Sequence, residues 1–96
     1  MTNPLFTTVG QVFLLVAVQP DSRVREIALH LGITERTVMH ALQNLTTAGL
    51  VRVLRSGRHN VYEVSRTGTL NVGPLEVGVN ELVALVAGGA QPDRPR

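Results

Sequence analysis

A short segment in the middle of the chain carries side chains that can form hydrogen bonds with the base edges of DNA. Arg36 can donate two hydrogen bonds to O6 and N7 of guanine, and Gln43 can pair with N6 and N7 of adenine. Glu35 can accept from N4 of cytosine, and Met39 can contact the methyl group of thymine. Together with two threonines suited to the phosphate backbone, the candidate contacts of this segment are Thr34, Glu35, Arg36, Thr37, Met39, His40 and Gln43. The alternative is a solvated helix face whose charges need no partner.

A second polar group lies further along the chain, where Arg55, Arg58 and His59 place three cationic or potentially cationic side chains within five residues. Such a cluster favours contact with phosphate groups or with the minor groove. A polar turn without any function would have a similar composition, and that interpretation stays open.

Other chemistries find little support in the sequence. The chain has no cysteine, which excludes disulfides and thiolate metal sites. Its three histidines, His30, His40 and His59, fall on different predicted elements, so we expect no metal site. There is no glycine-rich phosphate loop, and no set of catalytic residues on elements that obviously converge. We therefore expect neither a cofactor nor an enzyme.

The spacing of apolar residues predicts two helices that carry the first polar group. Val24, Ile27, Ala28 and Leu31 follow the i, i+3, i+4, i+7 pattern of one helix face, and Gly32 ends that helix. Thr34 is a suitable N-cap for the next helix, which we predict over 35–47. Its inward residues are expected to be Val38, Ala41, Leu42, Leu45 and Ala48, and Gly49 with Leu50 closes it.

The pair of helices from 24 to 48 satisfies the requirements of a helix-turn-helix. A small residue, Ala28, stands where the helices would cross, and Gly32 provides a tight turn four residues later. Apolar residues occupy the flanking buried positions, which are Ile27, Leu31, Ile33, Val38 and Ala41. An ordinary helical hairpin with coincidental spacing is the alternative.

A β-hairpin is predicted after these helices. Val51–Leu54 and Val61–Val64 are rich in β-branched and apolar residues, and the polar turn-forming loop 55–60 separates them. Tyr62 alternates with Val64 and is expected in the core.

The two ends of the chain are also apolar. Phe6, Val9, Phe13 and Val16 recur at helical spacing and predict a first helix over roughly 5–18, with Asp21 or Ser22 as the cap of the following one. Towards the C-terminus we predict a connector over 67–73, an extended stretch over 75–79, a short helix over 81–87 capped by Asn80, and a loose tail. A longer helix starting at Leu75 is the alternative. The predicted organisation is one domain over 1–88 and a tail over 89–96.

From Asp21 to Ser65 the chain resembles winged helix-turn-helix transcription regulators, particularly the small bacterial MarR-like and ArsR-like ones. The resemblance rests on Arg25-Glu26-Ile27-Ala28, Leu31-Gly32-Ile33-Thr34, Thr37-Val38, Ala41-Leu42-Gln43-Asn44-Leu45, Ala48-Gly49-Leu50-Val51 and Arg55-Ser56-Gly57-Arg58-His59-Asn60-Val61-Tyr62. It implies a mainly α fold with a three-helix core, a two-stranded wing and a short C-terminal helix. It also implies a recognition helix over 35–47 in the major groove and a wing over 55–60 on the backbone or minor groove.

Two departures from that family are visible. Arg23 stands at or near a position where such proteins often place Ser or Thr. The grouped ligands of ArsR-like metal sensors are missing, so the resemblance does not imply metal sensing.

The charge distribution agrees with a polyanionic partner. Residues 23–66 carry seven Arg against three Glu, a balance of +4, whereas the whole chain has a net charge of +2 and the remainder is therefore −2. We expect the partner to be double-stranded DNA.

A homodimer is expected because one recognition helix reads too few base pairs, and its candidate surfaces are the N-terminal helix and the C-terminal segment. A protein-interaction module and a nonspecific DNA-binding protein are the alternatives. The apolar run Val12–Val18 is too short to span a bilayer, and Met1–Leu5 lacks the positive charge of a secretory signal. We therefore expect a cytoplasmic protein without a membrane partner.

Overall fold

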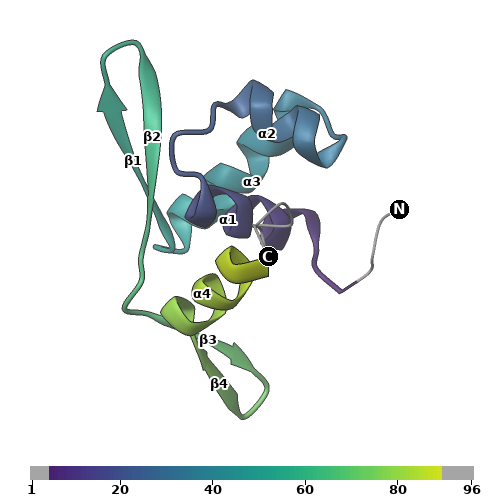
Figure 1. Cartoon of the computed structure of the whole chain (residues 1–96), viewed down its shortest axis with the longest axis vertical. Coiled ribbons are helices and arrows are strands. Elements are labelled where there is room, and N and C mark those ends of the chain that lie inside the picture. Colours follow the sequence, from purple (N-terminus) through teal and green to yellow (C-terminus); the bar gives the residue numbers. More distant parts are fainter. Residues whose placement is uncertain (1–4, 90–96) are drawn as a thin grey trace, which may run out of the picture.

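The structure is a computed structural model that describes residues 5–89, a part of the chain with four helices and two antiparallel β-hairpins (Figure 1). It therefore has a mixed α/β composition. In chain order the elements are α1 (Thr8–Val18), α2 (Val24–Leu31), α3 (Glu35–Thr47), β1 (Val51–Ser56), β2 (His59–Val64), β3 (Thr69–Val72), β4 (Leu75–Gly78) and α4 (Val79–Gly89). The predicted boundary of the tail over 89–96 is wrong at its first residue, because Gly89 still belongs to α4, and residues 90–96 lie outside the described residues.

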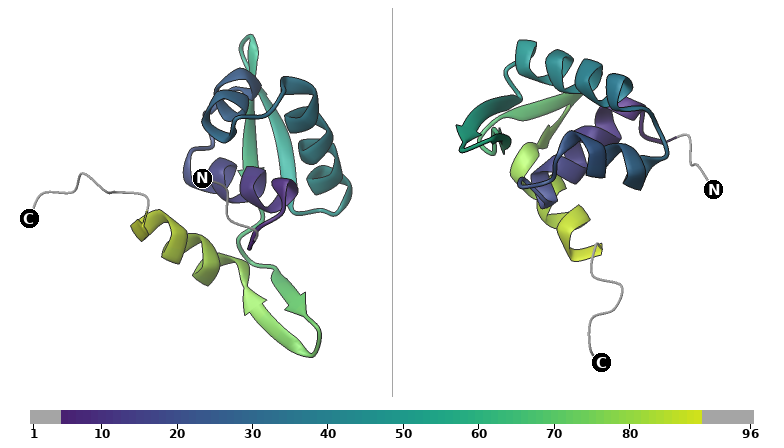
Figure 2. Two further views of the ribbon diagram at one scale, coloured as in Figure 1. Left: turned by 90° about the vertical axis from the view of Figure 1, so that its right-hand side faces the viewer. Right: turned by 90° about the horizontal axis from the view of Figure 1, so that it is seen from above.

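The core lies where α1 meets α3, α4 and strand β2 (Figure 2). Val12 and Val16 of α1, Ile27 of α2 and Val38 of α3 are completely buried. Because the chain has only two Phe and one Tyr, this core is filled mainly by branched aliphatic side chains. The inward positions predicted for α3 are buried except Ala48, which is exposed because it stands at the C-cap, after the last helical turn.

The predicted cap of α2 is wrong. Neither Asp21 nor Ser22 caps this helix, because the N-cap position is Arg23, whose backbone N–H donates to the Glu26 carboxylate at 2.9 Å. The side chain of Ser22 is buried instead, and its hydroxyl donates to Oε1 of Gln19.

The hairpin β1–β2 is longer than the sequence analysis predicted. Its register pairs Val51 with Val64 at the base and Ser56 with His59 at the top, so the turn contains only Gly57 and Arg58. The predicted loop 55–60 is therefore mostly strand. At the base the hairpin is closed by a hydrogen bond from the Ser65 N–H to the Leu50 carbonyl.

A second hairpin, β3–β4, replaces the predicted connector over 67–73. Gly73 has φ +59°, which suits the first position of a two-residue hairpin turn, and Pro74 occupies the second. The extended stretch predicted from Leu75 is confirmed as β4, and this strand excludes the longer helix that was the alternative.

The last helix begins earlier than predicted and without the predicted cap. It starts at Val79, whose N–H donates to the Gly68 carbonyl at 3.0 Å. Asn80 lies inside the helix, where its Oδ1 accepts from the Arg66 guanidinium at 3.2 Å.

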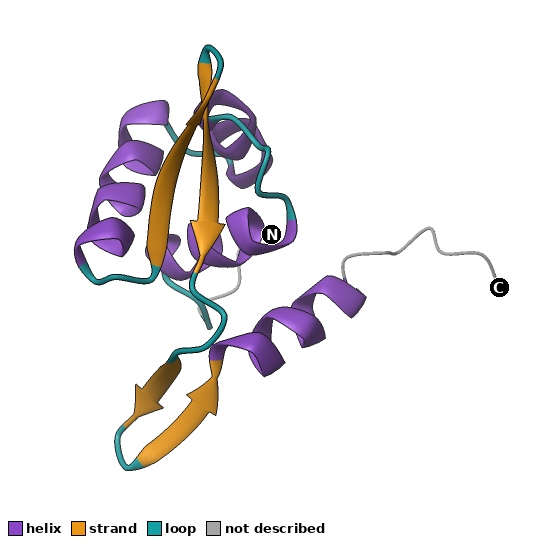
Figure 3. Cartoon of the chain, turned by 90° about the vertical axis from the view of Figure 1, so that its left-hand side faces the viewer, coloured by secondary structure: helices purple, strands orange, loops and turns teal. Residues whose placement is uncertain are grey.

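The elements give the molecule two distinct ends. The N-terminus of α3 and the tip of the β1–β2 hairpin lie at the same end in two views, and the β3–β4 hairpin projects from the opposite end (Figures 2 and 3). Within residues 5–89, no helix has the length and apolar character that crossing a bilayer requires.

Replacing Ile27 by Ala tests the packing of α2 against the core. Ile27 is fully buried, so we expect a loss of about 2–5 kcal/mol in the free energy of unfolding, measured by urea denaturation. Leu29→Ala is the matched control on the same helix, because Leu29 is 75% exposed and its loss should change stability by less than about 0.5 kcal/mol. Similar losses in the two variants would contradict the described orientation of α2.

Candidate nucleic-acid interface

The joint between α2 and α3 sets the direction of α3. Gly32 has φ +67°, a left-handed conformation that glycine adopts without strain. This conformation lets the carbonyl of Ala28 accept hydrogen bonds from the N–H groups of Gly32 and Ile33. The chain then leaves α2 after one tight turn, as the sequence predicted.

Thr34 is the N-cap of α3, which confirms the predicted start of this helix. Its Oγ1 accepts from the Thr37 N–H at 3.1 Å and lies 2.8 Å from the Thr37 hydroxyl. Capping by a side chain satisfies one of the backbone donors at the helix start. The two threonine hydroxyls are therefore bonded to each other at the exposed N-terminus of α3.

One face of α3 is polar and open to solvent. The predicted contact residues on it are all exposed, namely Thr34, Glu35, Arg36, Thr37, Met39, His40 and Gln43. The opposite face holds the buried residues Val38, Ala41, Leu42 and Leu45. Among the described residues, Arg36, His40 and Gln43 form no side-chain hydrogen bond or ion pair, so their polar groups are available to a ligand.

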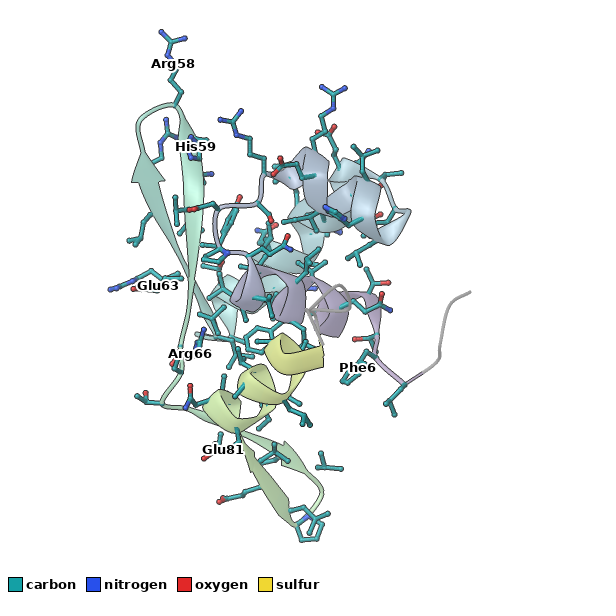
Figure 4. The ribbon with its side chains drawn as sticks, in the orientation of Figure 1. Phe6, Arg58, His59, Glu63, Arg66 and Glu81 are labelled. Carbon is teal, nitrogen blue, oxygen red and sulfur yellow. The ribbon has the colours of Figure 1, made fainter. Side chains whose placement is uncertain are left out.

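The tip of the β1–β2 hairpin carries the second predicted group. Arg58 extends away from the body of the molecule at the turn, and His59 follows it on β2 (Figure 4). Arg55 and Arg58 are exposed, whereas His59 is half-buried. The tip therefore presents two guanidinium groups to solvent, with an imidazole beside them.

The arginines of the middle segment divide into paired and unpaired ones. Arg52 forms a cross-strand ion pair with Glu63, and the guanidinium of Arg66 bonds to Asn80 and to the Ala17 carbonyl. By contrast, the guanidinium groups of Arg25, Arg36, Arg55 and Arg58 have no such partner within residues 5–89. Unpaired positive charge is therefore carried by α2, by α3 and by the hairpin tip, and the N-terminus of α3 lies at the same end of the molecule as that tip (Figure 2).

A hollow between α3 and the β1–β2 hairpin adjoins two of the predicted residues of α3, Met39 and Gln43, and none of the three predicted at the hairpin tip. It has a volume of about 270 Å³ and is lined by Val24, Met39, Leu42, Gln43, Thr46, Val53, Asn60 and Tyr62. Tyr62 is buried, as predicted, and forms part of this lining. Met39 and Gln43 thus stand between solvent and an apolar interior.

Asn60 is the residue that the sequence analysis missed. It was assigned to the turn, but it lies on β2, and its Oδ1 is buried without a hydrogen-bond partner among the described residues. A buried unpaired acceptor is uncommon in proteins. Asn60 belongs to the strand because the turn has only two residues, Gly57 and Arg58. The one feature of the sequence that indicates such a short turn is Gly57.

The three histidines lie on separate elements of the structure. His30 and His40 are exposed on separate helices and His59 is on β2. Within residues 5–89, no three His, Asp or Glu side chains come together in a group that could hold a metal ion.

Comparison with known proteins assigns no family. No protein-family model matches the chain, and no curated protein matches it.

Replacing Thr34 by Ala tests the cap that positions α3. The variant loses the hydrogen bond to the Thr37 N–H, so we expect the free energy of unfolding to fall by about 0.5–2 kcal/mol in urea denaturation. Thr34→Ser keeps the capping hydroxyl and should retain most of the stability. An equal loss in both variants would show that the cap hydrogen bond is not the source of the effect.

Proposed function

We propose that this chain is a sequence-specific DNA-binding transcription regulator of the winged helix-turn-helix type, similar to small bacterial MarR-like and ArsR-like regulators. It acts as a homodimer in the cytoplasm. In this proposal α3 is the recognition helix in the major groove, and the β1–β2 hairpin is the wing on the backbone or minor groove.

One observation carries the proposal. The N-terminus of α3, a helix with an exposed polar face, lies at the same end of the molecule as the cationic tip of the β1–β2 hairpin (Figure 2), and Arg36, Arg55 and Arg58 have no internal partners within residues 5–89. Duplex DNA is complementary to this arrangement. The base edges in the major groove can bond to the polar side chains of α3, and the phosphates beside the groove can bind the arginines of the hairpin tip. A helix of thirteen residues, such as α3, is about 20 Å long, enough to lie along a major groove.

The roles of the individual residues follow from their chemistry. Arg36 and Gln43 are the base-reading candidates because each can form a bidentate pair. Thr34 and Thr37 contact the phosphate backbone next to the helix N-terminus, where backbone dipoles also favour an anion. Arg58 neutralises phosphate charge at the tip of the hairpin.

A protein-interaction module is the second candidate. Leu29 on α2 is 75% exposed and Met39 on α3 is 60% exposed, which a protein partner would cover more favourably than DNA. The unpaired arginines favour DNA as the partner, because the duplex backbone carries many phosphates and each arginine that neutralises one adds to the affinity.

Selection of bound sequences from a random duplex pool, at a stated salt concentration, tests the proposal. We expect a recurrent, roughly palindromic motif with half-sites about one helical turn apart. Recovery of bound duplexes without a motif would mean nonspecific binding. No bound duplex at all would favour the protein-interaction module.

Arg36→Ala should then reduce affinity selectively. On the selected site we expect a loss of about 1–3 kcal/mol, measured by fluorescence anisotropy, and little change on random DNA. Arg52→Ala is the matched control, because it removes the same charge from a guanidinium that is already paired with Glu63. Equal losses on both duplexes would make Arg36 a phosphate contact rather than a base contact.

Arg58→Ala should reduce affinity for every duplex. Losing one phosphate contact should lower the slope of log affinity against log salt concentration by about 0.9. The measurement is a salt titration on the selected site and on random DNA, again with Arg52→Ala as control. Unchanged affinity would exclude the hairpin tip from the DNA contact.

A further inference from the structure

The side-chain amide of Asn60 is left incompletely bonded by the fold. Among the buried side-chain oxygen and nitrogen atoms of the described residues, only Oδ1 of Asn60 has no hydrogen-bond partner. Such an acceptor gives up its bond to water on folding and gains nothing in return, so it lowers the stability of the folded chain. A polar group kept at this cost points to a partner outside the chain.

Strand register places Asn60 on the inner face of the β1–β2 hairpin. Side chains alternate along a strand, so Asn60 shares a face with Tyr62, which is buried. Val53 is paired with Tyr62 across the strands and therefore belongs to the same face. All three residues line the hollow of about 270 Å³ between the hairpin and α3. The unpaired amide thus belongs to the wall of that hollow.

The wall of this hollow is mainly apolar and uncharged. None of the described residues that line it carries a charge, and its apolar members are Val24, Met39, Leu42 and Val53. A mostly apolar wall with a few polar groups is typical of sites that bind small molecules. A charged ligand would lose hydration in the hollow without meeting an opposite charge. The composition therefore favours an uncharged ligand.

The polar groups of the wall favour a ligand that donates a hydrogen bond. Oδ1 of Asn60 can only accept, and the Thr46 hydroxyl already donates to the Leu42 carbonyl at 2.8 Å, so it too has only lone pairs to offer. Oδ1 is shielded from solvent in the free chain. The terminal torsion of asparagine has broad energy wells, so a turn of the amide is enough to bring Oδ1 to a ligand.

The size of the hollow and the presence of Met39 favour a flat aromatic ligand. An apolar cavity of about 150 Å³ is large enough to bind benzene. The hollow is larger, at about 270 Å³, and has room for two fused rings. Met39 is 60% exposed, and its flexible thioether makes favourable contacts with aromatic rings.

We infer that this hollow is a binding site for a small, uncharged aromatic molecule that donates a hydrogen bond to Asn60. The site combines α3 with both strands of the hairpin and does not depend on the proposed function. A larger hollow of about 370 Å³ lies along α1 and β2, but the exposed, charged residues Glu63 and Arg66 line it. No buried side-chain atom without a partner belongs to the described lining of that larger hollow.

Occupancy of the site is linked to the exposed face of α3. Met39 and Gln43 line the hollow and are also predicted contacts of DNA. A ligand in the hollow competes with DNA for these two side chains. Under the proposed function, on which this coupling rests, ligand and DNA therefore weaken each other's binding by the same factor.

The first test compares two ring systems of the same shape, indole and benzofuran, by NMR titration of the full chain without DNA. Indole carries an N–H donor, and benzofuran has an oxygen in its place. We expect indole to bind with a dissociation constant of about 1 mM, as is usual for a ligand of this size, and at least tenfold more tightly than benzofuran. The signals that shift should include those of Asn60 and Thr46. No binding of indole, or equal affinities, overturns the inference and leaves the Asn60 amide to water.

Asn60→Leu separates ligand binding from folding. The variant lacks the unpaired oxygen, so we expect the equilibrium constant of unfolding to fall at least about fivefold in urea denaturation. The same variant should lose the preference for indole over benzofuran. Asn44→Leu is the matched control, because Asn44 is exposed on α3 and does not line the hollow. A preference that persists in Asn60→Leu overturns the inference, whatever the stability of the variant.

Fluorescence anisotropy on the selected duplex distinguishes this inference from the proposed function. Indole at ten times its dissociation constant should weaken DNA binding at least threefold, and benzofuran at the same concentration should not. Unchanged DNA affinity with indole bound overturns the coupling. A chain that binds indole but no DNA supports the site and refutes only the proposed function, and a chain that binds DNA but no indole does the reverse.

Discussion

The geometry of the candidate interface depends on the hydrogen bonds that the carbonyl oxygen of Ala28 accepts. It accepts two backbone hydrogen bonds, from Gly32 and Ile33, and these close the turn after α2 within a single residue of left-handed backbone. Since a turn this short leaves no slack, it determines the direction in which α3 departs. That direction brings Val38 into the core and leaves Arg36 in solvent. A looser turn would keep both helices but would lose the fixed angle between α2 and α3.

Much of this helical geometry could be predicted from the sequence because the signals are local. The bounds of α2 and α3 follow from apolar spacing and from Gly32 and Thr34, each of which acts within one helical turn. The prediction of the N-cap of α2 was wrong, and the reason lies in the backbone of the helix start. Asp21 and Ser22 have suitable side chains, but Arg23 takes the N-cap position, and Glu26 at the third helical position reaches back to its N–H.

The second hairpin was missed because its strands are only four residues long and its signal is weak. Gly73-Pro74 between two alternating stretches does indicate a two-residue turn, but Gly and Pro are equally common in connectors. The pairing of Leu70 with Val77 depends on contact with the core, which no local pattern records. Likewise, the sequence cannot distinguish a paired from an unpaired arginine. Glu63 lies eleven residues from Arg52 and becomes its partner only through strand register.

The shortness of the β1–β2 turn affects how Arg58 meets a ligand. Strand pairing continues up to Ser56 and His59, so only Gly57 and Arg58 remain outside the ladder. A long flexible loop would lose much backbone entropy when a ligand fixes it, and this loss would weaken binding. A two-residue turn has already lost most of that entropy during folding. The backbone that carries Arg58 is therefore pre-organised for binding. Inserting residues into the turn would lower the affinity for a ligand even though every charge is retained.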